Sequence, residues 1–290
     1  MFNRLLKKIN KVKSLEFDKA TEELEDFVYN NSNFLDILGE IGAIPESIEH
    51  DSTEEKLFSK VSDIVLSRAF IEIGLNSEVL KQRGNSADVF AESKFYGYSL
   101  VADAKSFRMS RTAKNQKDFK INSLNNWRGN SEYAILCNPY FQYPKKASQI
   151  YSQSMNYNVC LFSWEHFIFL IKNKIKENNK INFECIWNFG KYNSNKVLVS
   201  NRKECFLNNF NKYLCININK NEDDFTYILR NQKSKIKNRC NNEILYLENE
   251  IKLINNYSKE EAIKELIKSK KLKEKIKHIN DFIKGLNNDR

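Results

Sequence analysis

Three residues in the first half of the chain have the types and spacing that phosphodiester hydrolysis needs. Asp88 lies in the apolar stretch SADVFA, and Asp103 and Lys105 follow in LVADAKSF. Side chains alternate along a strand, so Asp103 and Lys105 point to one face while Ala104 points into the core. If the two stretches pair as a hairpin, Asp88 lies beside Asp103. Two carboxylates and one ammonium group then converge on one sheet face.

Such a group of side chains is suited to a divalent cation. Two adjacent carboxylates repel one another unless a cation lies between them. Mg²⁺ binds through one or two carboxylates together with water and phosphate oxygens, and it lowers the pKa of a bound water. We therefore predict that Asp88 and Asp103 bind Mg²⁺, with the backbone carbonyl of Ala104 completing the metal shell. Lys105 would position or activate the attacking water and offset charge on the phosphate.

The alternative is that these residues form a solvated ion pair on a surface strand, as most Asp-x-Lys tripeptides do. Both Asp88 and Asp103 interrupt apolar strand sequence, where an unpaired carboxylate is costly. The setting therefore favours a chemical role.

The elements around these residues indicate a mixed α/β core. Short strands are predicted at SEVLKQ, SADVFA and YSLVADAKS, and buried strands at EYAILC and NVCLF. Amphipathic helices are predicted over residues 15–40, 53–74 and 113–128, and from Ser163 onward. The order is helix, three strands, helix, strand, and then a further strand and helix, so helices should frame one mixed sheet.

Beyond about residue 180 the sequence becomes helical and rich in Lys and Asn. Ser258 and Glu261 have the spacing of a capping box at a helix start. We expect a catalytic core with N-terminal helices over residues 1–180. A helical lobe over 181–290, continuous with the core, would serve dimerisation or DNA clamping.

Positive charge points to a polyanionic partner. The net charge is +10 and the pI is about 9.1, which favours binding to phosphates. Basic residues recur every third position just after the predicted catalytic strand, with two amides among them. We predict DNA contacts for Arg108, Arg111, Lys114, Asn115, Gln116, Lys117 and Lys120. A solvated basic surface is the alternative.

Other candidate site residues have weaker support. Glu55 either approaches the metal from its helix or completes a capping box with Ser52. His166 is interpreted as a packing or helix-surface residue, because Lys105 already fills the role of base. The six cysteines form no CxxC pair and have no His at zinc spacing, so reduced thiols are expected.

The sequence also lacks signals for export or membrane insertion. It contains no run of about 20 apolar residues and no uninterrupted apolar signal region near the N-terminus. We therefore expect a cytoplasmic protein with no membrane partner.

Asp88 followed by Asp103-Ala104-Lys105 resembles the signature of the PD-(D/E)xK nuclease superfamily, although Ala87 stands where the signature has Pro. The element order also resembles that superfamily's common core, so we predict a restriction-endonuclease-like fold with a helical C-terminal lobe. Longer strings resemble the HindIII family of type II restriction endonucleases: TEEKLFSKVSDIVL, QRGNSADV, LVADAKSF, SRTAKNQKDFK, FQYP and LFSWEH.

This resemblance implies a bacterial homodimer that cuts both strands of a palindrome in double-stranded DNA. It implies the site AAGCTT cut after the first A, Mg²⁺ as cofactor, and 5′-phosphate ends. It also implies a cognate DNA methyltransferase as the other part of the restriction system. Two alternatives stay open: a repair or recombination nuclease with the same core, and a non-catalytic DNA-binding protein with structural carboxylates.

Overall fold

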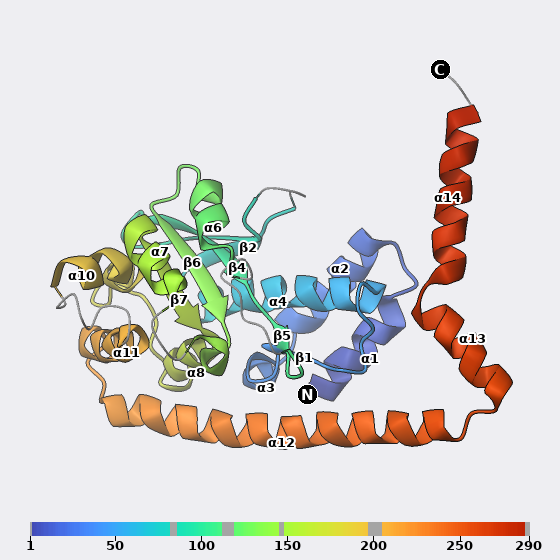
Figure 1. Cartoon of the computed structure of the whole chain (residues 1–290). Coiled ribbons are helices and arrows are strands. Elements are labelled where there is room, and N and C mark those ends of the chain that lie inside the picture. The colour runs from blue at the N-terminus through green and yellow to red at the C-terminus, as the bar shows by residue number, and fades with distance from the viewer. Residues whose placement is uncertain (1, 82–85, 112–118, 145–147, 197–204, 288–290) are drawn as a thin grey trace. The chain divides into compact units, whose positions relative to one another are not determined.

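A five-stranded mixed sheet lies at the centre of the fold (Figure 1). The computed structural model describes residues 2–81, 86–111, 119–144, 148–196 and 205–287. The strands follow the order β2 (Asn76–Val79), β3 (Val89–Glu92), β4 (Ser99–Ala104), β6 (Tyr133–Asn138) and β7 (Val159–Ser163). The first three are antiparallel neighbours, whereas β4, β6 and β7 run parallel. This confirms the predicted mixed α/β core.

Burial explains why the strands differ in sequence. Every residue of β6 and β7 is buried, as their continuous apolar runs predicted. Strand β2 lies at the edge of the sheet and its residues alternate between exposed and half-buried. Strand β4 is the strand at which antiparallel pairing changes to parallel pairing, and it has a hydrogen-bonded neighbour on each side.

Helices pack on the strands in two groups. Helix α4 (Thr53–Glu72) lies against β2, β3 and β4, and α1 (Phe2–Val12) and α2 (Phe17–Tyr29) pack on α4. Helices α6 (Ile121–Trp127) and α7 (Gln149–Tyr157) lie against β6 and β7. After β7 come α8 (Trp164–Lys172), α9 (Glu184–Trp187), α10 (Phe189–Lys196) and α11 (Phe206–Asn217). The short elements are α3 (Phe34–Leu38), η1 (Tyr140–Gln142), and β1 (Ala43–Ile44) paired in parallel with β5 (Phe107–Arg108).

Two predicted helices differ from the structure. The single helix expected over 15–40 is wrong, because α2 ends at Tyr29 and α3 begins at Phe34. Between them the Asn31 side chain accepts a hydrogen bond from the Asn33 N–H at 2.9 Å, an alternative to helical bonding. The helix expected over 113–128 is described only as α6, and residues 112–118 lie outside the described residues.

The chain divides into two compact units, Met1–Cys240 and Asn241–Arg290. This boundary lies well beyond residue 180, because the aromatic side chains Phe183, Trp187, Phe206 and Phe210 are all buried in the core of the first unit. The second unit comprises the end of α12 (Glu222–Asn255), α13 (Lys259–Ser269) and α14 (Leu272–Asn287). The capping box of Ser258 and Glu261 is present as predicted.

Two further expectations concern the whole described chain. All six cysteines are free thiols, as expected. Among the described helices, none is both long and apolar enough to cross a membrane.

Candidate active site

The register of the β3–β4 hairpin brings the two predicted metal-binding aspartates together. Val89 pairs with Ala102, which sets Asp88 beside Asp103. The Asp88 N–H donates to the Ala102 carbonyl at 3.2 Å, and the Asp88 carbonyl accepts from the Leu80 N–H at 2.8 Å. The backbone on both sides of Asp88 is therefore paired, although Asp88 itself precedes β3.

Asp103 and Lys105 meet at the carboxyl end of β4. The Lys105 ammonium forms an ion pair with Asp103 Oδ2, and only 2% of the Asp103 side chain is exposed. The backbone of Lys105 is held from two sides: its N–H donates to the Cys137 carbonyl at 2.8 Å, and Trp164 Nε1 donates to its carbonyl at 3.2 Å. Ala104, the last residue of β4, lies between the two side chains. The structure thus brings the three predicted catalytic residues into one group.

Burial and a neighbouring carboxyl make Asp88 a weaker acid. Burial, followed by a hydrogen bond and repulsion from the adjacent Asp103 carboxyl, raises the pKa of Asp88 to about 7. The positive charges of Lys105 and Lys60 act in the opposite direction. The two ammonium groups therefore do not fully offset the cost of ionising Asp88 and Asp103 at the same time.

A third carboxylate, which the sequence analysis missed, joins this group from helix α4. Asp63 is buried, and burial followed by repulsion from Asp88 raises its pKa well above the ordinary range. Lys60, one turn earlier on α4, lowers the pKa of both Asp63 and Asp88, and its ammonium donates to the Leu80 carbonyl at 3.3 Å. The only sequence signal for this residue was an aspartate within the apolar face of a helix.

We call Asp63, Asp88, Asp103, Lys60 and Lys105 the carboxylate cluster. Its three carboxylates outnumber its two ammonium groups, and the buried Asp103 Oδ2 has the Lys105 ammonium as its ion-pair partner. Within the described residues, no three His, Cys, Asp or Glu side chains are grouped closely enough to hold a metal by themselves. Mg²⁺ needs only one or two carboxylates, because water and phosphate oxygens fill its remaining positions. The pair of Asp88 and Asp103 fits that requirement.

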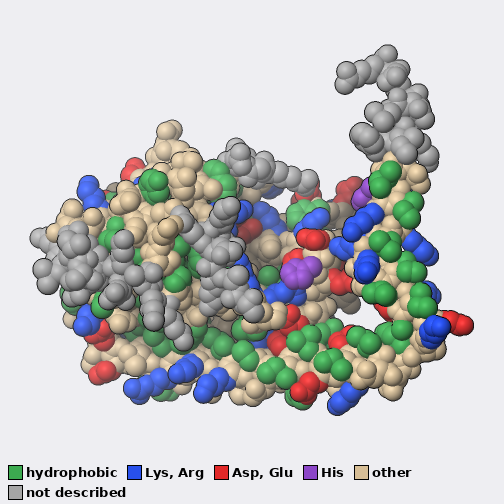
Figure 2. All heavy atoms as spheres, viewed as in Figure 1, with side chains coloured by type: hydrophobic (Ala, Val, Ile, Leu, Met, Phe, Trp, Pro, Cys, Tyr) green, Lys and Arg blue, Asp and Glu red, His purple; other side chains and the backbone are tan. Residues whose placement is uncertain are grey.

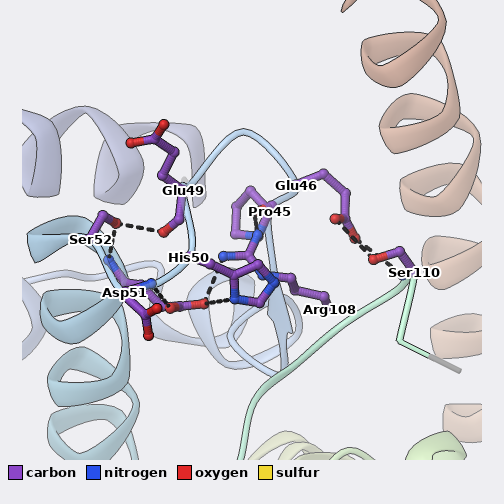
Figure 3. Close-up of polar contacts among 9 residues, drawn as sticks. Pro45, Glu46, Glu49, His50, Asp51, Ser52, Arg108 and Ser110 are labelled. Carbon is purple, nitrogen blue, oxygen red and sulfur yellow. Dashed lines mark hydrogen bonds and ion pairs between the residues drawn. The ribbon is translucent and has the colours of Figure 1, made fainter. Parts of the chain in front are cut away.

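Glu55 has other partners. Its carboxylate accepts from Arg108 Nη2 at 2.7 Å and from the Asp51 N–H at 2.8 Å, and it lies 3.5 Å from His50 Nδ1. Arg108 also donates from Nη1 to the Pro45 carbonyl at 2.8 Å, which ties the loop before α4 to β5 (Figure 3). Asp63 rather than Glu55 is therefore the α4 carboxylate that interacts with Asp88 and Asp103.

The capping box predicted at Ser52 is only half formed. Ser52 Oγ accepts from the Glu55 N–H at 3.1 Å, as an N-cap does. The Glu55 carboxylate bonds to the N–H of Asp51 instead of that of Ser52. Glu55 thus fixes the start of α4 together with the loop that precedes it.

The predicted DNA contacts fall into three groups. Arg108 is buried in its ion pair with Glu55. The Arg111 guanidinium lies over the Phe107 ring at 4.4 Å, and Lys120 precedes α6 with its ammonium 5.9 Å from the Trp127 ring. The other four positions, Lys114, Asn115, Gln116 and Lys117, lie outside the described residues.

His166 is a packing residue, as expected. Its ring nitrogens hydrogen-bond with Ser163 Oγ at 2.8 Å and Asn211 Oδ1 at 2.9 Å, and its ring stacks on Phe225. Burial lowers the pKa of His166 to about 4, so the ring is neutral at physiological pH. His166 therefore packs in the core as an uncharged side chain.

Comparison with known proteins identifies the relatives of this chain. The family model for the HindIII restriction endonuclease matches residues 4–283. The chain is also similar to the type II restriction enzyme HindIII of Haemophilus influenzae (strain ATCC 51907 / DSM 11121 / KW20 / Rd). The two are 45% identical over 290 residues, which cover 99% of this chain and 97% of that relative. The match therefore includes both compact units.

Proposed function

This chain belongs to the HindIII restriction endonuclease family, and from that premise we propose that it cuts both strands of DNA at one palindrome by Mg²⁺-dependent hydrolysis. The observation that carries the chemistry is the buried contact between Asp88 and Asp103, with the Lys105 ammonium beside it. Such a pair has excess negative charge in the protein alone and would gain from a bound cation.

Each residue of the group has a distinct role in this proposal. Asp88 and Asp103 would hold Mg²⁺ with the Ala104 carbonyl, and the ion would supply a Lewis acid and an acidified water. Lys105, fixed through its backbone, would orient the attacking water and offset the charge that develops on the phosphate. Lys60 balances Asp63 and Asp88 from the helix side. A metal role for Glu55 stays a prediction that its existing hydrogen bonds do not support.

The recognition site and the assembly are proposed on the family premise. We expect cutting at AAGCTT after the first A, with 5′-phosphate ends. A two-fold symmetric site is matched by a two-fold symmetric protein, so a homodimer would place one carboxylate cluster at each strand. The premise also supports a cognate DNA methyltransferase that protects the same site, and a location in the bacterial cytoplasm.

The proposed DNA contacts follow the catalytic strand in sequence. Arg111 and Lys120 flank the segment 112–118, and a basic residue just past the cutting site can hold the phosphate backbone there. Arg108 would have to leave Glu55 before it could take part.

The test is digestion of a long DNA of known sequence with Mg²⁺, with and without EDTA. We expect discrete fragments whose ends map to AAGCTT, lost in EDTA and lost in Asp103→Asn. A smear without preferred ends would instead indicate a repair or recombination nuclease. Binding without metal-dependent cutting would indicate a DNA-binding protein that is not an enzyme.

A further inference from the structure

The second compact unit carries two apolar rows with the spacing of coiled coils. Ile244, Leu247, Ile251 and Ile254 follow one another on α12 at alternating steps of three and four residues. Leu272, Ile276 and Ile279 do the same on α14. These steps give the heptad pattern in which one helix presents a continuous apolar edge to a partner helix. We call the two rows the α12 seam and the α14 seam.

Both seams are exposed. The exposed fractions reach 58% for Ile251, 59% for Ile276 and 60% for Ile279. Figure 2 shows hydrophobic side chains along these helices, and no side chain described between residues 241 and 281 is buried. Most of the stability of a helix in a protein comes from packing of its apolar face, and these apolar faces are not packed. Continuous exposed apolar surface of this kind marks an interface.

The charges beside each seam select its partner. Glu248 and Glu250 flank the α12 seam at the positions that face a neighbouring helix, whereas Lys273 and Lys275 flank the α14 seam. Pairing α12 with a second α12 would place acidic flanks together, and pairing two α14 helices would do the same with basic flanks. Pairing α12 with α14 places opposite charges side by side.

The chain does not make this pairing within itself. Helix α13 separates the two seams, and both remain exposed within the unit that contains them. In a two-fold dimer, the α12 seam of each protomer can meet the α14 seam of the other, so the contact forms twice. We propose that the occupant of each seam is a second copy of this chain, with α12 of one protomer packed on α14 of its partner. This inference rests on the homodimer of the proposed function.

The first test weakens one seam in the full-length chain. Ile251→Asp places a charge in the α12 seam, and Asn249→Asp makes the same charge change on the outer face of the helix. Sedimentation equilibrium without DNA or metal should give a dimer dissociation constant at least about tenfold higher for Ile251→Asp. Equal constants for the two variants would overturn the inference.

The second test asks whether the contact forms between chains. One variant carries Glu248→Lys with Glu250→Lys, and the other carries Lys273→Glu with Lys275→Glu. Each alone should dissociate, because both of its contacts would join like charges. An equimolar mixture should dimerise again, because both contacts of the mixed dimer join opposite charges. A mixture that stays monomeric would mean that α12 and α14 do not pair between chains, and would overturn the proposal.

A cleavage assay on the same samples separates this inference from the proposed function. Dimers that depend on the seams but cut no DNA would contradict the nuclease proposal alone. A wild-type chain that cuts at the palindrome while sedimenting as a monomer would overturn the seam pairing and the proposed homodimer, and would leave the nuclease activity standing.

Discussion

Two groups of charged side chains each include a carboxylate of helix α4, and they differ in how far positive charge offsets their negative charge. At the first turn, Glu55 has Arg108 and a backbone N–H as partners. Further along, Asp63 joins Asp88 and Asp103, whose negative charge Lys60 and Lys105 offset only in part. Burial removes water from the carboxylates of both groups. Only in the first group do partners within the chain replace the lost interactions with water. The balanced group holds elements in position, whereas the unbalanced group is suited to receive a cation and a phosphate.

The largest expected effect is on the unbalanced group. Lys105→Ala should lower single-turnover cleavage by about 10²–10³-fold, because a fixed positive charge beside the reacting phosphate is lost. DNA binding in EDTA should persist. Exposed Lys94 supplies the matched control, Lys94→Ala, which should cut normally. Cutting by Lys105→Ala at the wild-type rate would contradict the assigned role.

Next in size is the loss of the balanced ion pair. Arg108→Met should lower the free energy of unfolding by about 2 kcal/mol, because the partly exposed Glu55 carboxylate loses its ion-pair partner and the Pro45 carbonyl loses a hydrogen bond. Urea unfolding measures this, and Arg108→Lys, which keeps the charge, should lose less. Unchanged stability with weakened DNA binding would instead assign Arg108 to DNA contact.

A third buried group, His166, should respond to pH in a known direction. Its pKa of about 4 lies below the ordinary value of 6.5, so the unfolded chain binds the proton more readily. The stability that neutral His166 contributes is complete above pH 6.5 and is lost as pH falls towards 4. Between pH 7.5 and 5.0 the stability gap between wild type and His166→Gln should shrink by about 2 kcal/mol. A gap that stays constant in urea titrations would refute this.

The smallest effects should have opposite signs in the two groups. Burial and Asp88 raise the pKa of Asp63, which costs the folded state free energy at high pH, so in EDTA at pH 8 Asp63→Asn should stabilise the protein by about 1 kcal/mol. Glu55→Gln weakens a partly exposed ion pair and should destabilise it by about 1 kcal/mol. Both are measured by urea unfolding. Changes of the same sign would mean that the two groups do not differ in charge balance.

Local sequence predicted the hairpin that carries the predicted catalytic residues. Asp88 and Asp103 meet because neighbouring strands with alternating side chains pair through a short connection, and Lys105 follows two positions on. The helix start at Ser163 and the capping box at Ser258 were likewise visible from nearby residues. All of these depend on contacts between residues close in the chain.

Residues whose partners are distant in sequence were harder to predict. Asp63 occupies the apolar face of α4, and only the packing of that helix on β3 and β4 shows that it approaches Asp88. Arg108 turns inward because β5 pairs with β1, two strands of two residues each that have no periodic pattern. The DNA contacts could be predicted as a class from charge, but not assigned one by one.

The two backbone bonds that hold Lys105 have a consequence for biosynthesis. All five residues of the carboxylate cluster precede Cys137 and Trp164, whose backbone carbonyl and indole fix the end of β4. A growing chain on the ribosome therefore contains the predicted catalytic residues before it contains the two residues that hold Lys105 in place. We expect nuclease competence to appear only after Trp164 at the start of α8 has emerged, so that unfinished chains leave the genome of the host intact.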